Sequence, residues 1–168
     1  KMPKFLLLFV VAIPMFLCVN VCADSILLPV PFIPQCPPGN WSKTMNCGEA
    51  CLAMASSYAG GYWQATSETI LGIDNFLGFD ENGSSGSSCD DLIIAADSLF
   101  YLSLSKASWS LGQVKAEVKA GRPVIVGVMA NYLKTRPYYY PGAHWVLVIG
   151  YDDDKTALKS KTKGVIYV

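Results

Sequence analysis

The sequence of 168 residues contains little charge and almost no histidine. Charged residues make up 15% of the chain, and 13 basic side chains balance 13 acidic ones. There is no basic excess and no basic stripe interleaved with aromatic residues, so nothing points to a nucleic-acid partner. The one concentrated basic stretch, residues 155–163, is typical of a solvated hairpin. No internal repeat is evident.

Metal-binding patterns are missing as well. The chain has one histidine, His144, and no C-x2-C pair, and its cysteine spacings match no common zinc module. Residues 78–88, GFDENGSSGSS, have the polar composition of a calcium loop. Counted from Asp80, however, their glycine falls at the fourth position rather than the sixth. We therefore expect no metal and no organic cofactor.

The first 23 residues have the pattern of a secretory signal peptide. Two lysines precede an apolar run, and a small residue, Ala23, stands at the expected cleavage position. Pro14 and Asn20 interrupt the run, which is short for a membrane span. We expect cleavage after Ala23, a secreted or periplasmic location, and no stable membrane insertion of the mature chain.

Residues 24–168 fit one domain with a sizeable core. Cleavage of the signal would leave 11 basic and 13 acidic residues, a formal charge of −2. A lysine precedes Met2, and the chain stops at GVIYV, which has the pattern of an unfinished strand. We therefore expect a fragment of a longer protein that is truncated at its C-terminus.

Helical patterns fill the first half of this domain. Residues 24–40 form an entry segment in which five prolines favour extended backbone. The first helix is predicted over residues 46–59, where Asn46 and Glu49 have capping-box spacing and Gly60 follows the last turn. Its predicted core face carries Cys51, Leu52, Ala55 and Tyr58.

Three further helices are predicted over residues 66–77, 89–99 and 108–120. In the last one, Leu111, Val114 and Val118 share a face, and Gly121 ends the helix.

The hydrophobic period changes in the second half. Residues 122–129 and 143–151 are short apolar runs rich in β-branched side chains, which predict buried strands. Residues 152–155 predict a polar turn, and residues 164–168 begin a third strand. Helices first and adjacent strands last predict an α+β fold, with the N-terminal helices packed on one antiparallel sheet.

Four cysteines remain after signal cleavage: Cys36, Cys47, Cys51 and Cys89. In an exported protein an even number first suggests two disulfides. Cys47 and Cys51 lie one helical turn apart, a poor geometry for a bond between them. We expect a single Cys36–Cys89 bridge, which leaves Cys47 and Cys51 reduced.

Cys47 has the setting of a reactive thiol. Unpaired backbone N–H groups and the dipole at a helix start favour an anion, which predicts a lowered thiol pKa and a nucleophilic thiolate. Cys51 lies one turn deeper on the apolar face and is predicted to be buried and inert. The alternative for Cys47 is a structural thiol or one half of a disulfide.

A nucleophilic cysteine needs a base, and His144 is the one histidine available. It opens a predicted strand directly after a Pro-Gly-Ala turn, so its side chain could point from the sheet toward a helix end. A half-exposed surface histidine is the alternative. Together with a helix-start cysteine, His144 predicts a Cys–His pair. Tyr138–Tyr140 and Trp145 are candidates either for a nearby cleft or for packing.

The chain resembles the papain-like cysteine peptidases of the C39 family, and more closely the C39-like branch. The matching segments are VPFIPQ, NCGEACLAMASSYAGG, AGRPVIVGV and GAHWVLVIGYD, and they occur in the family's order at residues 30–35, 46–61, 120–128 and 142–152. The resemblance implies a papain-like fold and hydrolysis of a peptide bond through an acyl-enzyme. It also implies a peptide or protein substrate and no cofactor.

The resemblance implies a role for each matching residue. Cys47 would be the nucleophile, and His144 the general base and later the general acid. Gln35, together with the Cys47 backbone N–H, would stabilise the oxyanion. The aspartate that orients the histidine follows the next strand in the family, so we expect it beyond Val168. Asp152 is the less favoured candidate.

Two alternatives remain open. The same fold could act as a thiol acyltransferase or amidase, because an amine can resolve an acyl-enzyme as well as water can. The domain could also be a non-catalytic, disulfide-bonded binding module, which would require Cys47 to be in a disulfide. Many C39 members cut leader peptides after a double glycine and are fused to an ABC transporter. This sequence has an export signal and no transporter segment, so that role is not expected.

Overall fold

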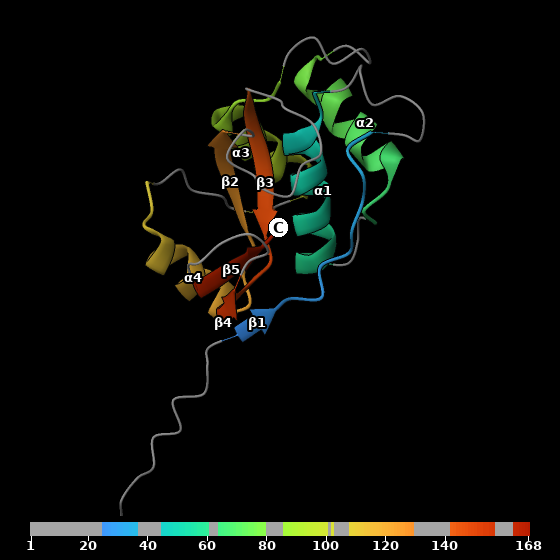
Figure 1. Cartoon of the computed structure of the whole chain (residues 1–168). Helices are drawn as coiled ribbons and strands as arrows, with labels where there is room; N and C mark the ends of the chain where they lie inside the picture. Colours follow the sequence, from blue (N-terminus) through green and yellow to red (C-terminus); the bar gives the residue numbers. More distant parts are fainter. Residues whose placement is uncertain are drawn as a thin grey trace, which may run out of the picture.

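The computed structural model describes residues 25–36, 45–60, 64–79, 86–100, 102, 108–129, 142–156 and 163–168. The predicted signal peptide, its cleavage site, Tyr138–Tyr140 and residues 80–85 of the polar segment 78–88 lie outside these residues. Helices precede most of the strands, which confirms an α+β fold (Figure 1). The elements are β1 Ser25–Leu27, α1 Cys47–Gly60, α2 Ser67–Leu77, α3 Cys89–Phe100, α4 Leu111–Lys119, β2 Val124–Met129, β3 Ala143–Val148, β4 Gly150–Thr156 and β5 Lys163–Tyr167.

All four predicted helices are present, but one start and one cap differ from the prediction. Helix α4 begins at Leu111 because Ser110 caps it: the Ser110 side chain accepts from the Gln113 N–H, and the Gln113 side chain accepts from the Ser110 N–H. The capping box predicted for Asn46 and Glu49 is wrong. Both Glu49 carboxylate oxygens are buried and neither has a hydrogen-bond partner, so this side chain does not cap α1.

The strands form two antiparallel sheets rather than the predicted single one. Strand β2 pairs with β3, and β4 lies between β1 and β5. The strand predicted over residues 143–151 is divided at Ile149. There the Ile149 N–H donates to the Tyr167 carbonyl at 3.0 Å and the Ile149 carbonyl accepts from the Leu28 N–H at 2.8 Å. The chain therefore leaves β2 and continues into the second sheet.

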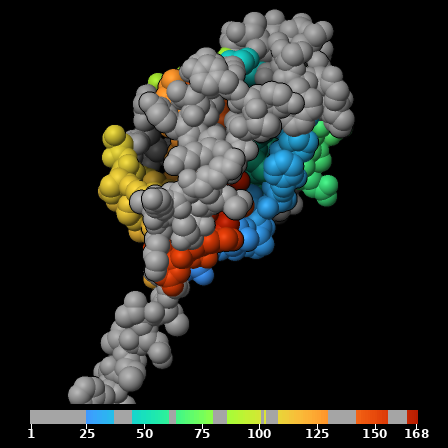
Figure 2. Space-filling model, viewed as in Figure 1, coloured from blue at the N-terminus to red at the C-terminus, as the bar shows by residue number. Residues whose placement is uncertain are grey.

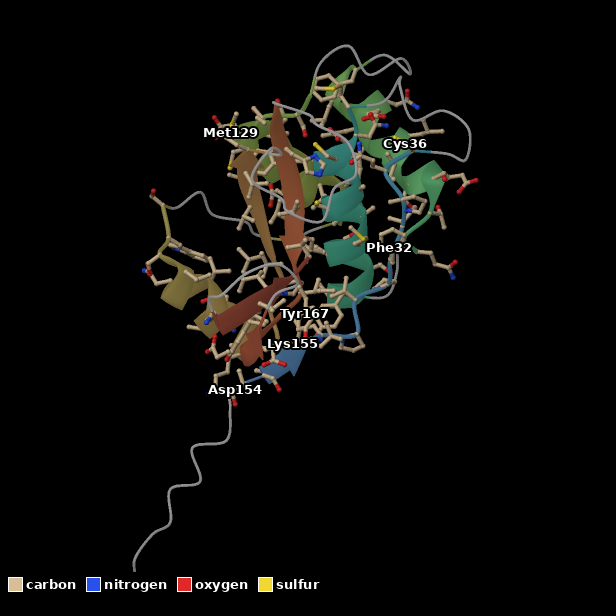
Figure 3. The ribbon with its side chains drawn as sticks, in the orientation of Figure 1. Phe32, Cys36, Met129, Asp154, Lys155 and Tyr167 are labelled. Carbon is tan, nitrogen blue, oxygen red and sulfur yellow. The ribbon has the colours of Figure 1, made fainter. Side chains whose placement is uncertain are left out.

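The aspartates predicted to form a turn lie within β4. The Asp152 carboxylate accepts from the backbone N–H groups of Asp154 and Lys155, at 3.1 and 2.9 Å, where the β4–β5 register shifts. Lys155 also donates to the Tyr167 hydroxyl at 3.2 Å, and both residues lie at the β4–β5 end of the molecule (Figure 3). These hydrogen bonds satisfy polar groups within the strand, so a run of polar residues can form part of β4.

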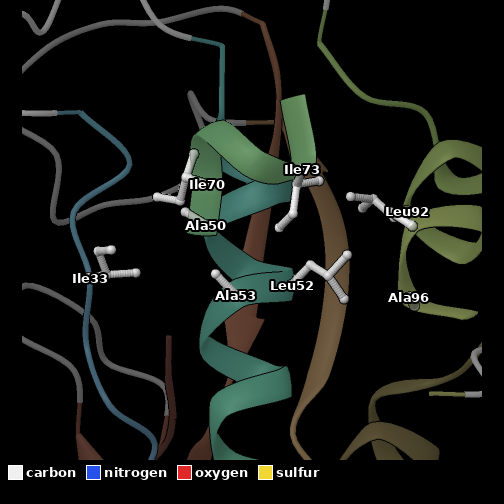
Figure 4. Packing of buried hydrophobic residues seen from close by; sticks show 9 residues of the cluster. Ile33, Ala50, Leu52, Ala53, Ile70, Ile73, Leu92 and Ala96 are labelled. Carbon is white, nitrogen blue, oxygen red and sulfur yellow. The ribbon is translucent and has the colours of Figure 1, made fainter. Parts of the chain in front are cut away.

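Helix α1 is the centre of the main core. It packs against β3 and against α2 and α3, and small residues such as Ala50 and Ala53 allow neighbouring chains to come close (Figures 1 and 4). Leu52 has no exposed surface. A second cluster includes Val114, Val118, Val148, Leu28 and Tyr151 and joins α4 to the strands.

The entry segment follows β1 along the outside of α1, where its extended chain is visible on the molecular surface (Figure 2). Ile33 is buried in the α1 core cluster and holds the segment there. This places Gln35 near the beginning of α1. In the part of the chain that the structure describes, no helix combines the length and apolar character needed to cross a bilayer.

The core assignment predicts contrasting effects for two leucines. Leu52→Ala should lower the free energy of unfolding by about 2–5 kcal/mol, because it leaves a cavity in a fully buried site. Leu111, predicted from the sequence to share a face with Val114 and Val118, is 57% exposed, so Leu111→Ala should change stability by less than about 0.5 kcal/mol. Urea denaturation of both variants measures this. Equal losses would contradict the assignment.

Candidate active site

A cavity of about 290 Å³ lies between the entry segment, the first turns of α1 and β3. All three residues predicted to carry out catalysis line it: Gln35, Cys47 and His144. They come from three separate segments of the chain. The rest of the described lining is uncharged and mostly apolar: Val30, Pro31, Phe32, Ile33, Ala50, Cys51, Met54, Trp145, Val146, Leu147, Ile149 and Val168. Phe32 is 83% exposed and stands at the outer surface of the entry segment (Figure 3).

Cys47 is the first residue of α1 and is half-buried. The helix starts here because the Ala50 N–H donates to the Asn46 carbonyl at 3.0 Å. The backbone N–H of Trp145 donates to Cys47 Sγ at 3.4 Å. This contact ties the thiol to β3 at the residue that follows His144. It therefore brings the cysteine and the histidine to the same cavity.

Gly48 allows this close approach. A Cβ atom at this position would overlap the Ser87 hydroxyl and would lie 3.1 Å from both Trp145 Cδ1 and Leu92 Cδ2. The Trp145 ring is fixed in turn by its Nε1–H, which donates to the Ser87 carbonyl at 2.9 Å. The glycine after the cysteine is thus needed for the helix start to pack on β3.

The electrostatic setting of Cys47 differs from the sequence prediction. Burial raises the pKa of its thiol above the ordinary value, and the Glu49 carboxylate raises it further. The backbone N–H groups of Trp145 and Gly48 act in the predicted direction and lower it, but they do not outweigh burial. The predicted lowering of the pKa by the helix start is therefore wrong. A thiolate at neutral pH needs a proton acceptor.

The other cysteines do not compete with Cys47 for this role. Cys51 is buried, and burial raises the pKa of its thiol strongly, as expected for an inert side chain. Cys47, Cys51 and Cys89 are all free thiols, so the predicted Cys36–Cys89 bridge is wrong. Cys89 lines a second cavity, and none of the described residues of the entry segment contributes to that cavity. The free thiol at Cys47 also argues against the disulfide-bonded binding module.

The structure does not bring Asp152 to the cavity. Its carboxylate is used within β4, where it accepts two backbone N–H groups. The neighbouring Asp153 contacts the Lys115 ammonium group. The orienting aspartate expected beyond Val168 stays a prediction. Within the described ranges, no three side chains of the His, Cys, Asp or Glu type are grouped so that they could hold a metal ion.

Two buried carboxyl groups beneath the first turn of α1 were missed in the sequence. Glu49 is 1% exposed and Asp74 is 3% exposed. Asp74 Oδ2 accepts from Asn46 Nδ2 at 2.7 Å. Helical spacing could have indicated the burial of Glu49, because it shares a face with Leu52 and Ala53, three and four residues later. The capping-box pattern suggested an exposed role instead.

The sequence matches the Peptidase_C39 like family over residues 27–162. The chain belongs to this family. The matched region contains Gln35, Cys47 and His144, and it supports a peptidase-like domain at the level of the family. No curated protein and no solved structure matches the chain significantly.

The contact between α1 and β3 gives a prediction for two glycines. Gly48→Ala should lower the free energy of unfolding by about 1–3 kcal/mol, because the new methyl group has no room beside Ser87 and Trp145. Gly72→Ala in α2 is the matched control. No atom lies within 4 Å of its Cβ position, so a gain of about 0.5–1 kcal/mol is expected. Similar effects in both variants, measured in urea, would contradict the packing described here.

Proposed function

We propose that residues 24–168 form the catalytic domain of an exported cysteine peptidase with a papain-like fold. The observation that supports this best is that Gln35, Cys47 and His144, which are far apart in the sequence, line one cavity. Membership of the C39-like family is consistent with it. The substrate is a peptide or protein, and the reaction needs no metal or organic cofactor.

In the proposed reaction, the imidazole of His144 takes the proton of the Cys47 thiol. This step offsets the effect of burial, which otherwise keeps the thiol protonated. The thiolate then attacks the peptide carbonyl carbon, and the negative charge develops on the carbonyl oxygen. The Gln35 side-chain amide and the Cys47 backbone N–H donate to this oxygen.

The second half of the reaction uses the same residues. The His144 imidazolium gives its proton to the leaving amine, and a thioester remains on Cys47. A water molecule then attacks the thioester carbonyl while His144 accepts a proton from that water. Collapse of the tetrahedral intermediate returns the proton to the sulfur and releases the acid product.

A mixture of peptides, analysed by mass spectrometry after incubation, tests the proposed activity. The wild-type protein should produce new peptide ends, and Cys47→Ala should abolish them. Cys89→Ala is the matched control and should retain activity, because Cys89 lines a different cavity. Peptides joined to an added amine would instead identify an acyltransferase. Equal cleavage by wild type and Cys47→Ala would refute the proposal.

Gln35 gives a second prediction. Gln35→Ala should lower kcat by roughly 10²–10³, with a smaller change in KM, because the lost donor acts mainly in the transition state. The rate of Cys47 alkylation should stay unchanged, since the variant does not alter the thiol or its base. An unchanged kcat would exclude Gln35 from the oxyanion site.

A further inference from the structure

The backbone N–H of Trp145 points at the thiol assigned above as the nucleophile. It donates to Cys47 Sγ at 3.4 Å. Strand β3 lies between β2 and α1 (Figure 1), and in an antiparallel pair alternate N–H groups point away from the partner strand. The Trp145 N–H is directed toward α1, so its partner is the sulfur rather than a carbonyl of β2.

This hydrogen bond favours the ionised form of Cys47. A donor bonds a charged acceptor more strongly than a neutral one, and the half-buried position of the sulfur limits competition from water. Burial raises the pKa of the thiol, the Trp145 N–H lowers it, and the Glu49 carboxylate raises it. Cys51 of α1 and His144 of β3 are the other titratable groups that line the same cavity. The N–H therefore acts against the effect of burial.

The indole ring of Trp145 fits between two glycines from different elements. At its five-membered end, a Cβ atom on Gly48 of α1 would lie 3.1 Å from Trp145 Cδ1. At its six-membered end, Gly127 of β2 pairs with Trp145 across the ladder, and a Cβ atom there would lie 3.3 Å from Cζ3. Helix α1 and strand β2 therefore both leave room for this ring and limit its movement.

The ring N–H adds a hydrogen bond to a fixed acceptor. Trp145 Nε1–H donates to the carbonyl of Ser87 at 2.9 Å, and Ser87 is buried just before α3. The start of α3 fixes this segment. The Ser88 N–H donates to the Asp91 carboxylate at 2.8 Å, and the Ser88 hydroxyl accepts from the Asp91 N–H at 3.2 Å. A capped helix start thus determines where the indole lies.

We propose that the Trp145 backbone N–H is a catalytic donor to the Cys47 thiolate, and that the indole ring, bonded to the Ser87 carbonyl, is the positioning group that holds it there. The donor acts on the free thiolate, before a substrate binds, whereas Gln35 is assigned to the substrate oxygen. It therefore increases the fraction of Cys47 that is ionised. The inference rests on the proposed function, in which Cys47 is the nucleophile.

An ester in place of one peptide bond tests the donor. The α-hydroxy analogue of tryptophan at position 145 replaces the N–H by an oxygen and keeps the indole. Alkylation of Cys47 by iodoacetamide, followed from pH 5 to 9 by peptide mapping, should shift to higher pH, with a rate about three- to tenfold lower below the midpoint. An ester at Val148, on β3 but outside the cavity, is the matched control. An unchanged profile with the Trp145 ester, or an equal shift with the Val148 ester, would overturn the proposal.

Two substitutions test the positioning role of the ring. Trp145→Phe keeps the backbone N–H but removes the bond to Ser87, so the alkylation profile should shift in the same direction, with a rate about two- to fivefold lower. Gly127→Ala places a methyl group against the other end of the ring and should act likewise. Trp109→Phe changes a tryptophan that is 41% exposed and should retain the wild-type profile. Wild-type profiles in Gly127→Ala and in Trp145→Phe would overturn the proposal, and Gly127→Ala alone decides if Trp145→Phe does not fold.

The inference and the proposed function can fail separately. Alkylation is measured without peptide turnover, so a protein that cleaves no peptide could still show the effect of the Trp145 N–H on the thiol. Conversely, an active peptidase whose Cys47 profile is unchanged by the Trp145 ester would retain the proposed function and lose this inference.

Discussion

The structure depends on the contact between the first turn of α1 and the beginning of β3. Trp145 of β3 forms this contact with its backbone N–H, which donates to Cys47 Sγ. Its ring N–H donates to the Ser87 carbonyl and holds the side chain in place. Gly48 provides the space for that ring. One residue thereby joins a helix, a strand and the segment before α3. The entry segment, held by Ile33, closes the cavity that this contact leaves beside Cys47.

Burial at this contact has opposing consequences for the chemistry. It shields the thiol from water, which raises its pKa against the effect of the nearby backbone N–H groups. A cysteine in this position is reactive only if a neighbouring base takes its proton, and His144 lines the same cavity. The Glu49 carboxylate, buried in the same helix turn, also opposes ionisation of the thiol.

The sequence predicted much of the fold and the residues that line the cavity, but it did not predict how strands distant in sequence pair. Helical and strand periods, cap residues and the order of elements predicted all four helices and the α+β fold. The division at Ile149 depends on Leu28 and Tyr167, which are distant in sequence, so local patterns could not indicate it. Glu49 was misassigned because one spacing fits both a capping box and a buried face. The wrong Cys36–Cys89 bridge followed from counting cysteines without their positions in space.

The most direct test is the alkylation of Cys47 by iodoacetamide at pH 6, compared between the wild type and His144→Ala. If His144 takes the proton of the buried thiol, the variant should react at least about tenfold more slowly at Cys47. Cys89, a half-buried free thiol outside the cavity, serves as the internal control and should react equally in both proteins. Equal alkylation of Cys47 in both proteins would contradict a Cys47–His144 pair and the proposed activity.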